Sequence, residues 1–123
     1  MKPRILVVED TPMSRELLCD WLDSEGYEVV AAADLTAAFA AVQARRPQAV
    51  LLDIQLGNED GIELVRWMRQ QPGYEHIPVV AVTAHALAAE QKRILQSGCT
   101  ASLSKPLDFG QLEEQLQQCL EAK

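Results

Sequence analysis

The sequence has few cysteines and no long hydrophobic run. Its three cysteines, Cys19, Cys99 and Cys119, are odd in number and widely spaced, which argues against a disulfide framework and against a Cys-x-x-Cys zinc site. No segment approaches the roughly 20 apolar residues of a membrane-spanning helix. The apolar run at residues 5–8 is followed at once by two acidic residues and is too short for a signal-peptide core. These absences predict a cytoplasmic protein with reduced thiols.

Positive charge is also scarce. The chain has 11 Lys plus Arg against 18 Asp plus Glu, a net charge of −7, so its surface gives no electrostatic reason to bind nucleic acid or an anionic membrane directly. An acidic balance suits a carboxylate cluster that concentrates a cation. The 123 residues predict a single domain, residues 1–123, with one core.

Short apolar runs alternate with longer helical patterns along the whole chain. Thr11, Asp34 and Asp108 are N-cap residues by type and precede three of the expected helices. Alternating units of this kind predict an α/β fold, a doubly wound five-stranded parallel sheet of order 2-1-3-4-5 with helices on both faces. The expected strands are residues 5–8, 28–32, 49–52, 79–82 and 101–103.

Reactive side chains follow these runs at the positions where each expected strand ends. Glu9 and Asp10 follow the first strand, Asp53 the third, Thr83 the fourth and Lys105 the fifth. In open parallel sheets the active crevice lies outside the carboxyl ends of the strands. The predicted strand order makes strands one, three and four neighbours, so we expect these side chains to converge on one crevice.

The residue types in this crevice predict phosphoryl transfer to an aspartate. Three crowded carboxylates repel one another and need a counter-charge, and Mg²⁺ (or Mn²⁺) is a hard cation that prefers oxygen ligands. The Thr83 hydroxyl and the Lys105 ammonium are suited to hold phosphoryl oxygens, with Asp53 as the nucleophile. Each residue alone is a weak signal, but five in order at strand ends are far more specific.

With these residues in this order, the sequence resembles the receiver domain of two-component signalling over essentially its whole length. The resemblance implies a flavodoxin-like fold and a phosphorylation-dependent signalling module that accepts a phosphoryl group onto Asp53 from a sensor histidine kinase or a phosphotransfer protein. It implies catalysis of the chain's own phosphorylation and dephosphorylation only. The matching segments are residues 5–10, 51–56, 60–61, 78–84 and 98–106.

The resemblance also assigns a metal site. Asp10 and Asp53 match direct Mg²⁺ ligands, and the backbone carbonyl of Gln55 matches the third protein ligand. Glu9 matches an acid that contacts the ion, often through water.

Three further residues match functional positions of the family. Thr83 matches the hydroxyl that moves toward the phosphoryl group, and Lys105 matches the cation of the site. The bond between Lys105 and Pro106 is usually cis in the family, although only about 5–6% of X-Pro bonds are cis in general.

The sequence departs from the family at Ser102 and in the loop after Asp53. Receivers usually carry Tyr or Phe at the position of Ser102, where the ring reports phosphorylation to partners. Either output travels by another route, such as backbone motion of residues 83–87, or the switch is weakly coupled; we favour the first. Gly57 stands where the family usually has proline, so we expect a more mobile loop.

Two positions that influence phosphate lifetime in the family are Gln55 and His85, two residues after Asp53 and Thr83 respectively. A Gln amide or a His ring can orient an attacking water. We hypothesise that this pair sets the dephosphorylation rate; the alternative is that both side chains are simply solvent-exposed.

No output domain is present within the 123 residues, so we expect the chain to act by docking. The usual receiver surface for a downstream protein comprises helix 87–97, strand 101–103 and helix 108–121, called the 87–121 face below. We expect a monomer or weak homodimer. Met1, just ahead of the first strand, fits a free-standing domain, although excision from a hybrid kinase is the alternative.

Three other functions fit the sequence less well. A haloacid-dehalogenase-type phosphatase needs a second Asp two residues after the nucleophile, where this chain has Gln55. A flavodoxin-like FMN carrier needs a Ser/Thr/Gly-rich phosphate loop after strand one, where this chain has residues 10–13, without glycine. A degenerate receiver that never takes phosphate is disfavoured because all five key side chains are present.

Overall fold

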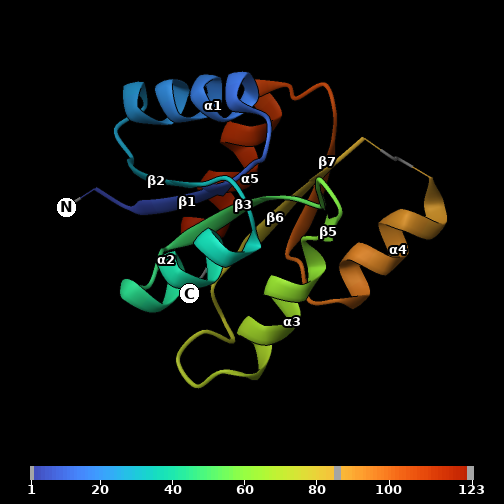
Figure 1. The fold of residues 1–123 in the computed structure, drawn as a ribbon. Helices are drawn as coiled ribbons and strands as arrows, with labels where there is room; N and C mark the ends of the chain where they lie inside the picture. The colour runs from blue at the N-terminus through green and yellow to red at the C-terminus, as the bar shows by residue number, and fades with distance from the viewer. Residues whose placement is uncertain (1, 85–86, 122–123) are drawn as a thin grey trace.

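A central parallel sheet carries helices on both of its faces in the computed structural model, which describes residues 2–84 and 87–121. Figure 1 shows α1 and α5 on one face and α2, α3 and α4 on the other. The strands of the sheet are β1 (Arg4–Val8), β2 (Glu28–Ala32), β3 (Ala49–Asp53), β6 (Val79–Thr83) and β7 (Ala101–Ser104). The helices are α1 (Pro12–Ser24), α2 (Leu35–Ala44), α3 (Ile62–Gln70), α4 (Ala88–Gln96) and α5 (Phe109–Glu121).

The strand order is β2-β1-β3-β6-β7 and every neighbouring pair is parallel. This confirms the predicted doubly wound sheet of order 2-1-3-4-5. None of the helices in the described ranges has the length and apolar character that crossing a bilayer requires.

Alternation along the strands divides the apolar interior into two parts. Leu6, Val50 and Ala81 belong to the cluster beneath α2, α3 and α4. Leu51 and Val80 belong to the cluster that includes residues of α1 and α5. All residues of β1, β3 and β6 are buried, as continuous apolar runs in a doubly covered sheet should be.

The expected capping residues lie at the starts of their helices. Asp34 accepts a hydrogen bond from Ala37 N–H at 2.8 Å at the start of α2, and Asp108 accepts one from Gly110 N–H at 2.8 Å before α5. Thr11 occupies the N-cap position of α1, but its side chain makes no capping hydrogen bond. Two of the three expected caps therefore satisfy free N–H groups at a helix start.

The segment after Asp53 is a small hairpin. Strands β4 (Gln55–Leu56) and β5 (Glu59–Asp60) pair antiparallel, with Gly57 and Asn58 as the two-residue turn between them. Gly57 has φ +62°, which fits the glycine preference at the first turn position of such hairpins. Strands of two residues are too short to leave a periodic pattern, so the sequence predicted only a loop here.

Gly61 lets the chain return close to the end of β3. Its N–H donates to the Ile54 carbonyl at 2.7 Å. A Cβ at Gly61 would lie 2.5 Å from the Asp53 backbone oxygen and 3.1 Å from Leu52 Cδ1. The hairpin therefore closes against β3 only because residue 61 has no side chain.

We predict that Gly61→Ala lowers the free energy of unfolding by about 2 kcal/mol, because the added methyl group must displace packed backbone. Gly110→Ala is the matched control, since its Cβ would meet only the Asp108 side-chain oxygen at 3.1 Å. In α5 it should leave stability unchanged or raise it by up to about 1 kcal/mol. Urea unfolding measures both, and a Gly61→Ala protein as stable as the parent would contradict the steric interpretation.

Candidate functional site

Four of the sequence-predicted side chains meet at the carboxyl edge of the sheet. Asp53 and Thr83 are the last residues of β3 and β6, while Glu9 and Lys105 directly follow β1 and β7. Lys105 N–H donates to the Thr83 carbonyl at 2.8 Å, which links the carboxyl ends of β6 and β7. The Lys105–Pro106 bond is cis, the isomer that the family resemblance implied.

Three carboxylates crowd this edge. Oxygen atoms of Glu9, Asp10 and Asp53 lie within 4.8 Å of one another, a spacing that could hold a metal ion. Glu9 and Asp53 are buried, with 2% and 6% of their surface exposed, while Asp10 is partly exposed. Asp10 is therefore the most exposed of the three carboxylates.

Lys105 supplies positive charge to the two buried carboxylates. Its Nζ lies 3.0 Å from Asp53 Oδ2 and 3.4 Å from Glu9 Oε1. Burial alone would lower the pKa of Lys105, but the hydrogen bond and charge of Asp53, aided by Glu9, outweigh burial and raise that pKa. The lysine is therefore held in its charged form.

Glu9 remains short of stabilising partners despite this lysine. Burial, followed by the neighbouring Asp53 carboxyl, raises the pKa of Glu9 to about 7, while Lys105 acts in the opposite direction. Its Oε2 is buried without a hydrogen-bond partner among the residues that the structure describes. The local chemistry therefore favours either a proton or an added cation at this position.

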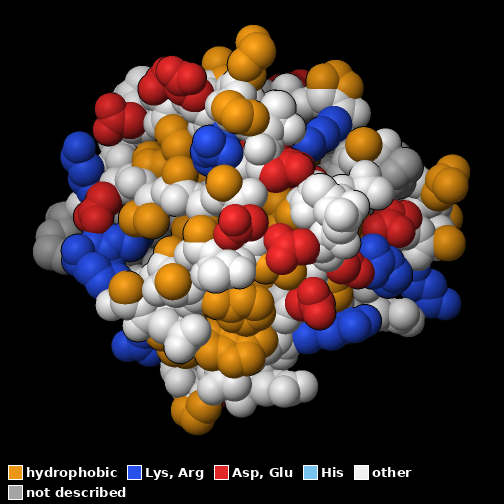
Figure 2. Space-filling model, viewed as in Figure 1, with side chains coloured by type: hydrophobic (Ala, Val, Ile, Leu, Met, Phe, Trp, Pro, Cys, Tyr) orange, Lys and Arg blue, Asp and Glu red, His pale blue; other side chains and the backbone are white. Residues whose placement is uncertain are grey.

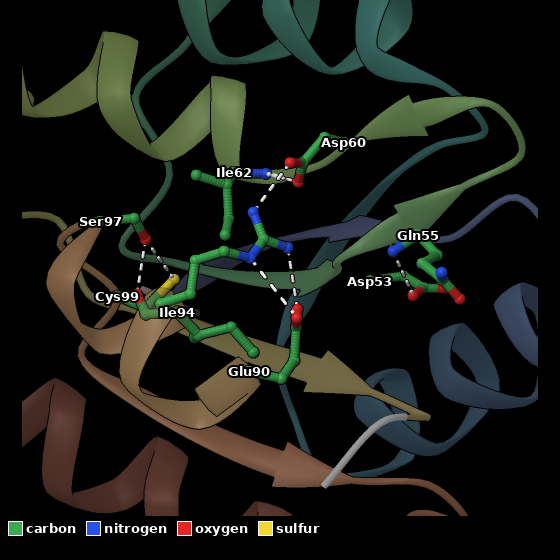
Figure 3. A network of polar contacts seen from close by, with 9 residues as sticks. Asp53, Gln55, Asp60, Ile62, Glu90, Ile94, Ser97 and Cys99 are labelled. Carbon is green, nitrogen blue, oxygen red and sulfur yellow. Dashed lines mark hydrogen bonds and ion pairs between the residues drawn. The ribbon is translucent and has the colours of Figure 1, made fainter. Parts of the chain in front are cut away.

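Gln55 contacts the site through its backbone. Its N–H donates to Asp53 Oδ1 at 3.1 Å, and Figure 3 shows the two residues side by side at the end of β3. The Gln55 residue is exposed. The two carboxylate oxygens of Asp53 thus have different partners, the Lys105 ammonium and the Gln55 amide.

Three other predicted positions are Thr83, His85 and Ser102. Thr83 is buried, with 1% of its surface exposed, and His85 lies outside the described residues. Ser102 lies in β7 opposite Ala81 of β6. Its Oγ is buried and has no hydrogen-bond partner within the described ranges.

Sequence reasoning missed an apolar cleft beside the carboxylates. A cavity of about 260 Å³ is lined by Asp53, Leu17, Leu107 and Phe109 among others. In α1, Met13 and Leu17 lie at helical spacing with the buried Leu18 and Leu22. Spacing alone would therefore predict that they are buried as well, but Met13 and Leu17 are 82% and 58% exposed. Periodicity defines a helix face but not how far the underlying sheet extends beneath it.

Comparisons with known proteins agree on one family. Residues 5–117 match the response regulator receiver domain model. The polar-differentiation response regulator DivK of Brucella anthropi is 33% identical over 120 residues, covering 98% of each chain.

Solved structures are similar over nearly the whole chain. The receiver domain of a sensor histidine kinase from Pseudomonas aeruginosa has a TM-score of 0.90 and 32% identity, covering 99% of this chain and 100% of that one. That receiver domain has a magnesium ion coordinated in its active-site cleft. The chemotaxis response regulator CheY4 of Vibrio cholerae has a TM-score of 0.90 and 28% identity, covering 98% of this chain and 100% of that one.

With the sheet order, the carboxylate cluster and these likenesses in agreement, the chain belongs to the response regulator receiver domains of two-component signalling.

Proposed function

We propose that this receiver accepts a phosphoryl group onto Asp53 from the histidine of a sensor kinase or phosphotransfer protein and thereby changes its affinity for a partner protein. The supporting observation is the placement of Asp53, buried at the end of β3 with one carboxylate oxygen 3.0 Å from Lys105 Nζ and the other 3.1 Å from Gln55 N. A nucleophile held in this way is oriented before the phosphoryl donor binds.

The acidic cluster fits a magnesium ion. Hard cations bind oxygen ligands, and here three carboxylates lie within reach of one another while the buried Glu9 Oε2 has no partner among the described residues. Asp10, Asp53 and the Gln55 carbonyl would hold the ion, with Glu9 close by. When bound, Mg²⁺ (or Mn²⁺) neutralises carboxylate and phosphoryl charge.

Three side chains of the protein take part in the phosphoryl transfer. An Asp53 oxygen forms the new bond to phosphorus while the bond from phosphorus to the donor imidazole nitrogen breaks, and that nitrogen keeps the electron pair. The Lys105 ammonium and the Thr83 hydroxyl hold phosphoryl oxygens. The chain catalyses no reaction beyond its own phosphorylation and dephosphorylation.

Two exposed apolar areas support separate docking roles. A donor histidine that reaches Asp53 passes the cleft and the exposed Leu17 of α1. On the 87–121 face, Leu87 and Leu95 are 74% and 51% exposed. The first area suits the kinase or phosphotransfer protein, and the second suits the downstream partner.

Beryllofluoride with Mg²⁺ mimics the phosphoryl group and tests the proposal directly. We predict that the parent protein binds it and that Asp53→Asn does not, because the carboxylate that must bond to beryllium is lost. Asp34→Asn is the control, since it removes one negative charge at a helix cap that asparagine can still make. Fluorine NMR detects the bound species; no binding by the parent would reject phosphoacceptance at Asp53.

Glu9 gives a prediction for metal-free protein. Its pKa is raised from 4.5 to about 7 in the folded state, so between these values the folded protein holds a proton that the unfolded chain lacks. Stability therefore falls as pH rises through this window. Glu9→Gln should remove that fall and exceed the parent by about 2 kcal/mol at pH 8 in EDTA.

Saturating Mg²⁺ should abolish most of this advantage, because the ion stabilises the Glu9 carboxylate of the parent but not the amide. Glu16→Gln, at an exposed position of α1, is the matched control and should follow the parent at every pH. Thermal unfolding from pH 5 to 8, with and without Mg²⁺, measures the effect. A Glu9→Gln curve parallel to that of the parent would contradict it.

The lifetime hypothesis concerns Gln55 and His85. If they orient the attacking water, the Gln55→Ala, His85→Ala double variant should keep its aspartyl phosphate on the order of ten-fold longer than the parent. Gln70→Ala, at an exposed position of α3, should not change the lifetime. Decay of radiolabelled phosphoprotein gives the rates, and equal lifetimes in the parent and the double variant would end the hypothesis.

A further inference from the structure

The hairpin that bears Gln55 is held at three points outside its own two strands. Glu59 Oε1 accepts from Leu35 N–H at 3.1 Å at the start of α2. Asp60 Oδ1 accepts from Ile62 N–H at 3.1 Å at the start of α3. Asp60 Oδ2 accepts from Arg93 Nη1 of α4 at 2.9 Å. One short segment thus contacts three different helices through two adjacent acidic side chains.

Arg93 is shared between the hairpin and its own helix. Its Nη2 donates to Glu90 Oε1 at 2.8 Å, so the guanidinium lies between Glu90 and Asp60. The hydrogen bonds that Arg93 donates to Glu90 and then to Asp60 raise its pKa above the ordinary value. Figure 3 shows Asp60 and Glu90 pointing toward the same space, and Figure 2 shows acidic side chains around the position of β5 with basic ones beside them toward α4.

This bridge is connected to the phosphorylation site by backbone pairing. Gln55 lies directly opposite Asp60 in the β4–β5 ladder, and Gln55 N–H donates to Asp53. Asp60, the residue that Arg93 contacts, is therefore paired with a residue that contacts Asp53 directly. The path from Asp53 to α4 needs only Gln55, Asp60 and Arg93.

Helix α4 is the element best suited to respond. Ile94 is its one buried residue, whereas α3 buries Ile62, Leu64, Val65 and Met68. An element with few buried apolar contacts moves at low cost. A partly exposed ion pair contributes little to overall stability. It can still influence the position of a helix that few other contacts hold.

From these contacts we propose that Arg93 is a positioning residue that couples occupancy of the Asp53 site to α4 through Asp60. The inference rests on the proposed function and goes beyond it by naming a route to the 87–121 face. Such a route would bypass position 102, where this chain has serine in place of the aromatic residue that receivers usually carry.

The experiment compares Arg93→Met with Lys92→Met. Lys92 is the exposed neighbour on α4 and makes no ion pair within residues 2–84 and 87–121, so the control removes the same charge without removing the bridge. Two quantities are measured in each protein: affinity for beryllofluoride at saturating Mg²⁺, and the amide chemical-shift changes that this ligand causes in α4 and at Gln55 and Lys105.

For Arg93→Met we expect affinity lower by about three-fold, the scale of an exposed pair, and α4 shift changes reduced to less than about half of those in the parent. The changes at Gln55 and Lys105 should persist, which a globally unfolded variant would not show. Lys92→Met should match the parent in both quantities.

Asp60→Asn provides an independent test because asparagine can still accept from Ile62 N–H. It should reduce the α4 response as Arg93→Met does, and the double variant should respond no less than either single variant. The inference is overturned if Arg93→Met behaves like Lys92→Met, or if the Asp60 and Arg93 effects simply add. Absence of binding by the parent protein would instead overturn the proposed function, and the coupling with it.

Discussion

Mutual repulsion among three carboxylates is the constraint on which the rest of this structure depends. Glu9, Asp10 and Asp53 place their oxygens within 4.8 Å of one another, and two of the three are buried, where charge is costly. Lys105 compensates part of that charge, but burial, followed by the neighbouring Asp53 carboxyl, still raises the pKa of Glu9 to about 7. A site left short of positive charge in this way is suited to a bound cation.

The backbone around Asp53 positions the groups that contact its carboxylate. Gly61 allows the chain to come back against the Asp53 carbonyl where any side chain would collide, and the β4–β5 hairpin then presents Gln55 to the carboxylate. The same hairpin is linked through Asp60 to Arg93 on the sparsely buried α4. Short polar contacts thus connect the site with the 87–121 face. This receiver has Ser102, which carries no aromatic ring, at the position where receivers usually have one.

Much of the fold followed from local pattern. Short, mostly apolar runs predicted the five strands of the sheet, and Asp34 and Asp108 marked helix starts where they do form caps. The pattern failed where burial depends on the packing beneath a helix, because Met13 and Leu17 continue the apolar stripe of α1 yet are exposed. It also missed the hairpin, since two-residue strands have no period to detect.

The sequence by itself determined the alternation of strands and helices, and with it the rule that places Glu9, Asp53, Thr83 and Lys105 at one sheet edge. Tertiary structure alone decided which atoms meet there, and that Arg93 binds Asp60, a residue 33 positions away. The physical reason is that periodicity and turn chemistry act over a few neighbouring residues. Ion pairs, cavities and burial instead arise from segments that approach one another only after the sheet has assembled.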